Sequence, residues 1–330
     1  MRDVICIGEA LVDFLPERPG RRVAEVETWT RCSGGSPANV AVGVARLGGR
    51  SALIGVVGAD EFGDFLKTSL ATEGVDVSHV RQTEEGKTGL VFISLTETGE
   101  RSFSFHRTRA AEQFLDEREI DADFLSRARA IHCGTNSLLW DKAQTAMLRM
   151  LRIAKGSGRI LCCDPNLRLH LWPDPEVLRN LIGQILPMCS VVKLSEDEIE
   201  FVVGTRDVDE ALTTLNDGGV PLPMVTLGSR GAAFLWQGRI VRVPAPSVPV
   251  VDTTGAGDGF TAAFLFGLTR LFPDADTLLK AGVGELRELA TFACQVGSTV
   301  VQKMGAVAGL PRLSDVEGRL PGVLRSSTRS

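Results

Sequence analysis

The chain has 330 residues, 44% of them hydrophobic and 23% charged, so it can bury a large core and is not a disordered segment. A formal net charge of −5 without any basic run excludes the charge pattern of a nucleic-acid-binding protein. The 35 glycines exceed the usual share of about 7%, which favours turns and places where the backbone approaches a ligand.

The longest apolar runs, at residues 52–58 and 262–268, are far shorter than the ~20 residues of a membrane span. The start of the chain has no signal-peptide pattern. The seven cysteines are scattered and form no C-x-x-C pair. We therefore expect a cytoplasmic protein with buried, reduced thiols, with no membrane partner and no structural zinc site.

Short apolar runs alternate with stretches of helical period along most of the chain. Strands are expected at residues 4–7, 53–57, 130–133, 160–163, 191–194 and 224–227. Helices are expected between them at residues 37–47, 62–73, 142–154, 177–186 and 196–203. This alternation predicts an α/β fold, a doubly wound and mainly parallel sheet with helices on both faces.

Two segments, at about 14–32 and 88–107, interrupt the alternation. In the second, apolar runs at 90–95 and 102–106 flank the glycine-bearing loop 96–100, which is typical of a β-hairpin. The two segments predict a small second sheet that forms a lid, with an ordinary surface hairpin as the alternative. Residues 1–313 would then form one domain, and the polar residues 314–330 a frayed C-terminal tail.

The most informative local feature is Asp-Thr-Thr-Gly-Ala-Gly-Asp-Gly-Phe at residues 252–260. Glycines directly before an apolar helical run leave free N–H groups at a helix N-terminus, which favours an anion such as a phosphoryl group. A carboxylate in such a loop repels a passive phosphate, but it suits a base that takes a proton from an attacking hydroxyl. Asp258 is therefore a candidate base, and the alternative is a glycine-rich turn with Asp258 as helix N-cap.

An earlier glycine cluster precedes the first predicted helix. Gly34 and Gly35 would let a polyhydroxylated ligand lie against the backbone, and Asn39 offers both a donor and an acceptor. A plain loop-to-helix junction is the equal alternative. Asp13 follows the first strand, where open α/β sheets bind ligands, so it is placed to accept hydrogen bonds from sugar hydroxyls unless it lies in a solvated turn.

Further polar clusters follow later strands. Asp164, Asn166 and Arg168 offer an acceptor, a mixed group and a cation, although a solvated polar turn fits equally. The acids after Ser195 could organise water around a magnesium ion, and this role is compatible with a capping box between Ser195 and Glu198. The glycine-bearing segment 226–231 is by itself only a tight turn.

The order of these motifs is similar to that of the ribokinase-like (PfkB) carbohydrate kinases, and the resemblance extends from about residue 4 to residue 311. Residues 8–14 and 164–172 look most like those of fructokinases within that family. The resemblance implies an ATP-dependent sugar kinase that converts fructose to fructose 6-phosphate, with Mg²⁺ and a monovalent cation such as K⁺. It also implies a homodimer formed through the lid, with sugar and ATP as the small-molecule partners.

The resemblance also implies a role for each matching residue. Asp258 would be the base, with the amides of Gly255, Ala256 and Gly257 as the anion hole. The sugar would be held by Asp13, Gly34, Gly35, Asn39, Arg107 and Arg168. The nucleotide and its magnesium would be held by Ser195, Glu198, Thr226, Gly228 and Gly231, with Glu198 acting on Mg²⁺ through water. The monovalent cation would lie near Asp252 and Thr254.

Two departures from the family pattern stand out. Ser195 replaces a common asparagine, as in many fructokinase-like members, and Cys294 stands where relatives often have asparagine, which leaves the purine contacts open. Rival readings are a 2-keto-3-deoxygluconate kinase, a ribokinase or a nucleoside kinase on the same fold, and a non-catalytic sugar or nucleotide sensor. A dehydrogenase is disfavoured because residues 255–259 lack the G-x-G-x-x-G spacing.

Overall fold

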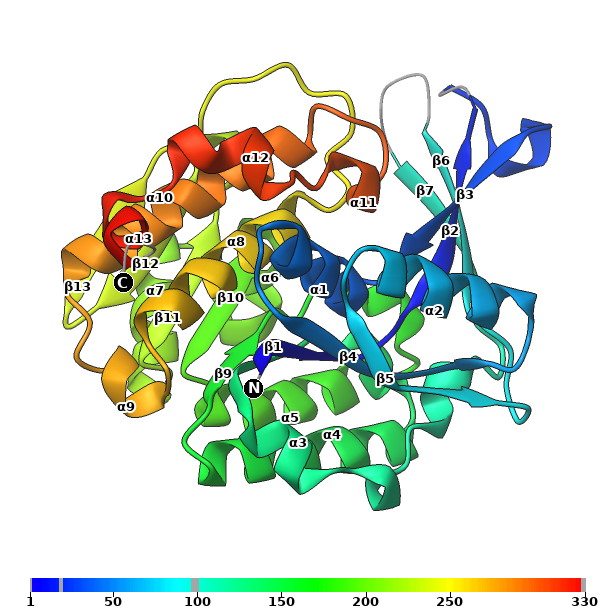
Figure 1. Cartoon of the computed structure of the whole chain (residues 1–330), viewed down its shortest axis with the longest axis horizontal. Helices are drawn as coiled ribbons and strands as arrows, with labels where there is room; N and C mark the ends of the chain where they lie inside the picture. The colour runs from blue at the N-terminus through cyan, green and yellow to red at the C-terminus, as the bar shows by residue number, and fades with distance from the viewer. Residues whose placement is uncertain (1, 18–19, 96–100, 328–330) are drawn as a thin grey trace.

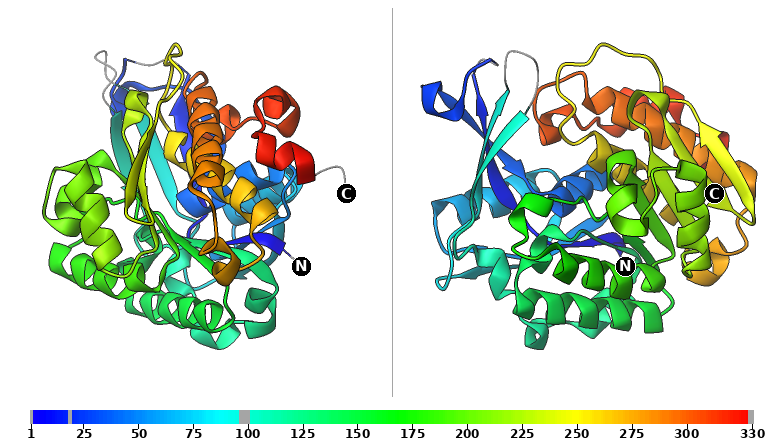
Figure 2. Two further views of the ribbon diagram at one scale, coloured as in Figure 1. Left: turned by 90° about the vertical axis from the view of Figure 1, so that its left-hand side faces the viewer. Right: turned by 180° about the vertical axis from the view of Figure 1, so that it is seen from behind.

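A large sheet with helices on both faces forms the body of the molecule, and a small sheet projects from one side of it (Figures 1 and 2). The computed structural model describes residues 2–17, 20–95 and 101–327. The order of strands in the large sheet is β13 (Arg239–Val243), β12 (Ala232–Trp236), β11 (Leu222–Thr226), β10 (Val191–Ser195), β9 (Ile160–Cys163), β8 (Ala128–Cys133), β1 (Arg2–Ile7), β4 (Ser51–Gly58) and β5 (Asp76–Thr83). All neighbours are parallel except β11, β12 and β13, which pair antiparallel.

The helices divide between the two faces of this sheet because successive strand residues point to opposite sides. Val4 and Cys6 face one core and Ile5 and Ile7 the other. The first core is closed by α1 (Ser36–Arg46), α2 (Glu61–Thr72), α8 (Ala256–Leu271) and α10 (Val283–Val300). The second is closed by α3 (Ala122–Ser126), α4 (Asp141–Gly156), α5 (Pro175–Ile185), α6 (Glu196–Val203) and α7 (Val208–Asp217). The predicted doubly wound α/β fold is confirmed.

The small sheet has the order β3 (Trp29–Gly34), β2 (Leu11–Pro16), β6 (Leu90–Leu95) and β7 (Arg101–His106). It confirms that both interrupting segments belong to one second sheet, although the predicted loop 96–100 lies outside the described residues. The structure also corrects one assignment, because Asp13 lies on strand β2 of this sheet and is not in a turn after β1. We call this four-stranded sheet the lid.

The sequence analysis missed strands β5, β12 and β13, whose residues alternate between buried and exposed or rely on small side chains. It also expected residues 314–330 to be frayed, and this is wrong for the part that the structure describes. Short helices α11 (Ala306–Gly309), α12 (Leu313–Val316) and α13 (Gly322–Ser327) run over the first core, as α9 (Ala275–Leu278) does elsewhere. Val316 and Leu324 are buried there because each inserts an apolar side chain that the polar composition of the segment obscured.

Within the described residues, no helix has both the length and the hydropathy that crossing a membrane requires.

Candidate active site

The carboxyl ends of the parallel strands and the inner face of the lid enclose a cavity of about 220 Å³. Such an edge is where open α/β sheets bind ligands. The cavity brings together eight of the predicted site residues, namely Asp13, Gly35, Asn39, Arg107, Arg168, Gly255, Gly257 and Asp258. We call it the inner cavity. Its lining mixes charged groups with the apolar side chains of Leu11, Val91, Ile93 and Phe105 from the lid.

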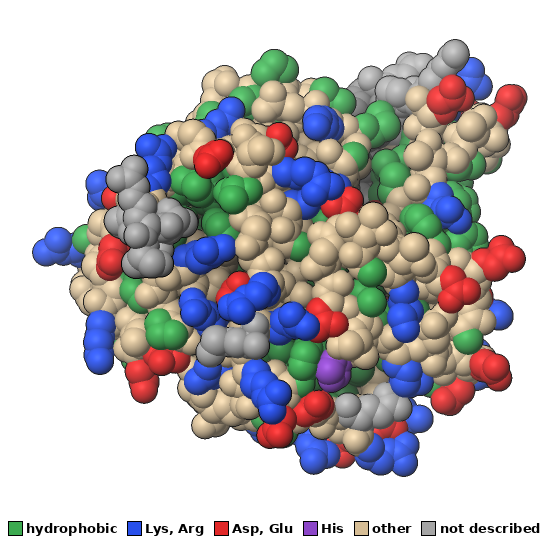
Figure 3. Space-filling model, in the orientation of Figure 1, with side chains coloured by type: hydrophobic (Ala, Val, Ile, Leu, Met, Phe, Trp, Pro, Cys, Tyr) green, Lys and Arg blue, Asp and Glu red, His purple; other side chains and the backbone are tan. Residues whose placement is uncertain are grey.

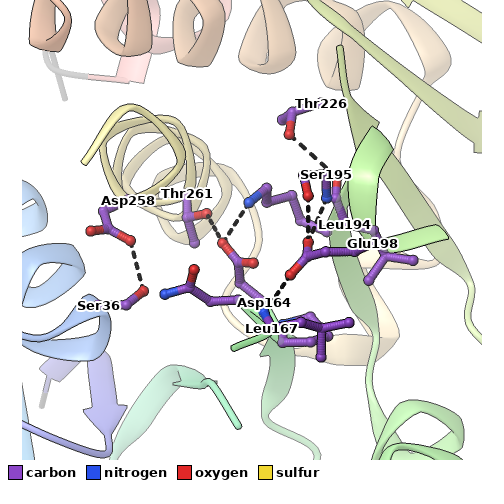
Figure 4. A network of polar contacts seen from close by, with 12 residues as sticks. Ser36, Asp164, Leu167, Leu194, Ser195, Glu198, Thr226, Asp258 and Thr261 are labelled. Atoms are coloured by element: carbon purple, nitrogen blue, oxygen red, sulfur yellow. Dashed lines mark hydrogen bonds and ion pairs between the residues drawn. The ribbon is translucent and has the colours of Figure 1, made fainter. Parts of the chain in front are cut away.

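Asp258 lies in the first turn of α8, and its carboxylate is held from the opposite helix α1. Ser36 Oγ donates to Oδ1 at 2.7 Å and Asn39 Nδ2 donates to Oδ2 at 2.8 Å. Gly255, at φ +79°, is the helix N-cap, so the alternative of Asp258 as N-cap is wrong. Burial raises the pKa of Asp258, while the two donated hydrogen bonds oppose that rise. The carboxylate is thus oriented and made more basic than an exposed aspartate (Figure 4).

Asp13 approaches the same cavity from lid strand β2, across from Asp258. A Cβ on Gly34 would lie 2.2 Å from Asp13 Oδ2, so glycine at this position makes room for the carboxylate. Gly34 therefore contributes to the site by its lack of a side chain, although it does not line the inner cavity. Burial, and then the charge of Asp258, raise the pKa of Asp13 to about 7. Two carboxyl groups with raised pKa values in one cleft are typical of a functional site.

The loop before α8 is held in place at both ends. A Cβ on Gly255 would lie 2.7 Å from Ala306 Cα, so only glycine fits at this positive φ. Asp252 Oδ1 accepts from the amide (2.9 Å) and hydroxyl (2.7 Å) of Thr254, and Oδ2 accepts from the amide of Gly305 (2.8 Å). Helix geometry leaves the first amides of α8 without intrahelical acceptors. The amide of Ala256 donates only a long bond, 3.3 Å, to Thr253 O, so this turn presents donors to an anion.

A second cavity, of about 660 Å³, lies on the other side of the same loop, and we call it the outer cavity. Thr226, Gly228 and Gly231 line it as predicted, together with Cys294 on α10. Its volume is in the range of about 300–1,000 Å³ that suits a cofactor-sized ligand. Gly257 lines both the inner and the outer cavity. The glycine loop is therefore the place where ligands in the two cavities would meet.

The model of a known family agrees with this arrangement. The pfkB family carbohydrate kinase model matches residues 1–313. The chain belongs to the pfkB family. It is therefore a carbohydrate kinase, which confirms the resemblance drawn from the sequence motifs.

Individual pfkB relatives match over nearly the whole chain. Probable fructokinase-7 of Arabidopsis thaliana is 40% identical, covering 99% of this chain and 93% of the relative. Fructokinase-2 of Solanum habrochaites is 37% identical, covering 97% and 96%. The Xylella fastidiosa fructokinase with bound ATP superposes with a TM-score of 0.88 at 33% identity, covering 96% and 97%. A double-mutant Vibrio cholerae fructokinase in fructose, ADP and potassium ion bound form gives 0.87 at 32%, covering 97% and 98%.

In this pfkB kinase, Glu198 holds together two segments that follow neighbouring strands. Its Oε2 accepts from Ser195 N (2.7 Å) and Ser195 Oγ (2.9 Å), which completes the predicted capping box. Its Oε1 accepts from Leu167 N at 2.6 Å. The carboxylate thereby fixes the loop after β9, which carries Asn166 and Arg168, beside the start of α6 (Figure 4).

Arg107 reaches the inner cavity from the end of β7, but most of its donors are already engaged. It forms a buried ion pair with Glu112 at 2.7 Å and donates to Asn136 O at 3.1 Å. Nearby, Ser137 Oγ donates to Glu9 Oε2 at 2.6 Å, and burial raises the pKa of Glu9. Glu9 and Asn136 line the cavity, and the sequence analysis assigned neither of them.

A further residue that the sequence analysis left unassigned is Lys193 on β10. It is 6% exposed and pairs with Asp164 at 2.7 Å. A signal was available in the sequence, because Lys193 stands between valine and leucine in a strand expected to be buried on both faces. A lysine there is almost never fully buried without a partner.

Proposed function

We propose that this chain transfers the γ-phosphoryl group of ATP to the primary hydroxyl of fructose, forming fructose 6-phosphate and ADP. The observation that carries the proposal is the position of Gly257, which lines both cavities directly beside Asp258. A sugar in the inner cavity and a nucleotide in the outer cavity would present their reacting atoms to the same turn of α8. The identity to fructokinases of 35–40% over nearly the whole chain supports fructose as the acceptor.

Asp258 acts as the general base in this scheme. The sugar hydroxyl gives its proton to the carboxylate while its oxygen bonds to the γ-phosphorus, and the bond from that phosphorus to the bridging oxygen of ADP breaks. Ser36 and Asn39 keep the carboxylate oriented, at 2.7 and 2.8 Å. Because phosphoryl transfer needs mainly positioning and charge stabilisation, the amides of Gly255, Ala256 and Gly257 act as the anion hole.

The sugar is held between the lid and the sheet edge. Asp13 accepts hydroxyl hydrogen bonds, Asn39 Oδ1 is buried with no partner among the described residues, and Arg168 supplies donors from the loop after β9. Gly34 and Gly35 keep the backbone free of side chains at this point, since a Cβ on Gly35 would lie 2.4 Å from Glu9 O. Arg107 acts mainly by joining the lid to residues 112 and 136.

Magnesium fits the donors next to the outer cavity. No group of three or more metal-ligating side chains occurs in the described part of the chain, so Mg²⁺ would keep most of its waters. Glu198 and the unpartnered buried Asp164 Oδ1 would accept hydrogen bonds from those waters. The ion would neutralise charge on the phosphates. Metal titration of ATP binding tests this, and full ATP affinity in chelator would contradict it.

A monovalent cation near Asp252 and Thr254 is proposed on weaker ground, with the potassium ion bound form of the Vibrio cholerae enzyme in support. The Asp252 carboxylate already accepts three hydrogen bonds that hold the loop before α8. A cation here would therefore stiffen the anion hole and raise kcat. Equal rates in potassium and in tetramethylammonium buffers would contradict this role.

We also propose a homodimer formed through the lid. Rings of Phe14, Trp29 and Phe92 are only half-buried on the lid and contact one another, with Phe14 and Phe92 stacked at 4.7 Å. Hydrophobic side chains gather over the lid strands at the upper right of Figure 3. A monomer mass in sedimentation at micromolar concentration would contradict the dimer. A cytoplasmic location is proposed from the seven free cysteines of the described chain, and fractionation tests it.

Fructose should be the preferred acceptor in a sugar panel. We expect kcat/KM for fructose, measured by coupled ADP detection, to exceed that for ribose, 2-keto-3-deoxygluconate and nucleosides by at least about 10²-fold, since buried polar groups left without a hydroxyl partner are costly. A higher kcat/KM for another sugar would reassign the substrate. ADP formation with none of them would favour the non-catalytic sensor.

Acidification should reduce kcat at a higher pH than an ordinary aspartate would. Burial raises the pKa of Asp258, and that of Asp13 rises to about 7. The base must be ionised, so activity is present above the raised pKa and is lost as pH falls through it. Asp13→Asn removes the like charge beside Asp258 and should move this loss to lower pH. An unchanged profile in the variant, at saturating fructose, would contradict the coupling.

A further inference from the structure

Lys193 is a buried cation beside the glycine loop, and no role in the reaction has yet been given to it. Its side chain lines the inner cavity. It also lines a third cavity, of about 710 Å³, whose walls include Ser195, Glu198 and Thr226. Gly257 is common to the linings of the inner, outer and third cavities. Lys193 thus lies where the sugar side and the nucleotide side of the site join.

The position of the ammonium group is tightly defined. Lys193 Nζ donates to Asp164 Oδ2 at 2.7 Å, and Thr261 Oγ1 on α8 donates to the same oxygen at 3.3 Å. Figure 4 shows Asp164 and Thr261 facing each other beneath the turn that carries Asp258. The neighbouring carboxylates, led by Asp164, outweigh burial and raise the pKa of Lys193, so the group stays charged at neutral pH.

The ammonium also lies against the loop that would hold the phosphoryl group. A Cβ placed on Gly257 would be 3.2 Å from Lys193 Nζ, and this is the nearest contact such an atom would make. An ammonium has three N–H donors, and in the described structure one of them is directed to Asp164. The remaining donors are available on the cavity side.

The charge balance of the inner cavity requires such a group. Its lining carries the carboxyl groups of Glu9, Asp13, Asp164 and Asp258, which would oppose a polyphosphate. Among its cations, Arg107 is committed to Glu112. A preorganised cation next to Gly257 would offset the charge that develops on the phosphoryl oxygens during transfer.

We propose that the Lys193 ammonium contacts the transferring γ-phosphoryl group together with the amides of the glycine loop, and that Asp164 is the positioning residue that holds Lys193 there. The inference rests on the proposed function, since it takes the glycine loop as the phosphoryl site. Lys193 keeps its protons throughout, because the hydroxyl proton goes to Asp258 and the electron pair of the broken bond stays with ADP. The role of Lys193 is catalytic by contact and purely electrostatic.

The test uses Lys193→Met, which keeps length and removes charge. We expect kcat to fall by about 10²–10³-fold, the usual loss for one stabilising donor. Calorimetry should show a loss of at least about 10-fold in affinity for a non-hydrolysable ATP analogue, with ADP affinity within about twofold of wild type. Equal losses for the analogue and for ADP would overturn the proposal. This readout remains valid if the wild type phosphorylates no sugar in the panel, so the two failures are distinguishable.

Loss of Lys193 leaves Asp164 buried without its cation, which could unfold the chain and imitate the predicted loss. The double variant Lys193→Met with Asp164→Asn removes both charges and serves as the control. We expect it to unfold near the wild-type temperature, yet to keep the low kcat and the lost preference for the ATP analogue. Recovery of kcat to within about fivefold of wild type in the double variant would show that Lys193 merely balances Asp164, and would overturn the proposal.

Discussion

Asp258→Asn is expected to lower kcat by about 10²–10⁴-fold while fructose still binds, because the amide cannot accept the hydroxyl proton. The substitution should preserve the fold. Ser36 can still donate to the side-chain oxygen, and the Asn39 amide can turn so that its unpartnered Oδ1 accepts from the new amide. Steady-state ADP release and equilibrium binding of fructose measure the two effects separately.

Asp207→Asn is the matched control, since it makes the same chemical change at an exposed N-cap of α7 far from the site. Asparagine caps helices as well as aspartate does, so both kcat and the unfolding temperature should stay near wild type. If Asp258→Asn retained more than about a tenth of the wild-type kcat, another group would have to be the base.

Gly255→Ala is expected to damage both catalysis and stability. The position has φ +79°, and the new Cβ would lie 2.6 Å from Ala306 Cβ and 2.7 Å from its Cα. The backbone must shift, which moves the amides of the anion hole, and displacing one such donor costs about 10²–10³-fold in kcat. The strained φ alone costs about 1–3 kcal/mol of unfolding free energy. Chemical denaturation and kcat measure the two losses.

Gly204→Ala separates the strain from the displacement. This glycine ends α6 at φ +81°, and a Cβ there would have nothing within 4 Å. We expect a similar loss of unfolding free energy from the backbone conformation with kcat unchanged. A comparable kcat in Gly255→Ala and Gly204→Ala would mean that the position of the glycine loop does not limit catalysis.

The sequence predicts the sheet and most of the site because both depend on local patterns. Short buried runs mark the parallel strands, and polar clusters directly after them mark the edge where ligands bind. Asp164, Arg168 and Glu198 are found in this way, and the glycine-rich turn before α8 identifies Asp258. The family motifs then supply the roles that no single cluster specifies.

What the sequence could not predict depends on contacts between distant segments. The pairing of Ser36 with Asp258 joins positions 222 residues apart, and that of Lys193 with Asp164 joins positions 29 residues apart. Asp13 belongs to a lid strand only because β2 pairs with β3 and β6. The packing of Leu324 against the first core likewise depends on tertiary contacts that a polar segment does not reveal.

The most direct test of the central claim is the identity of the phosphorylated product. The wild-type chain is incubated with fructose, ATP and Mg²⁺, and the sugar ester is assigned by ³¹P and ¹³C NMR. A base beside a single phosphoryl site predicts one ester, at the C6 hydroxyl, formed in equal amount to ADP and absent in Asp258→Asn. An ester at another carbon, or ADP and free phosphate without any sugar ester, would contradict the account.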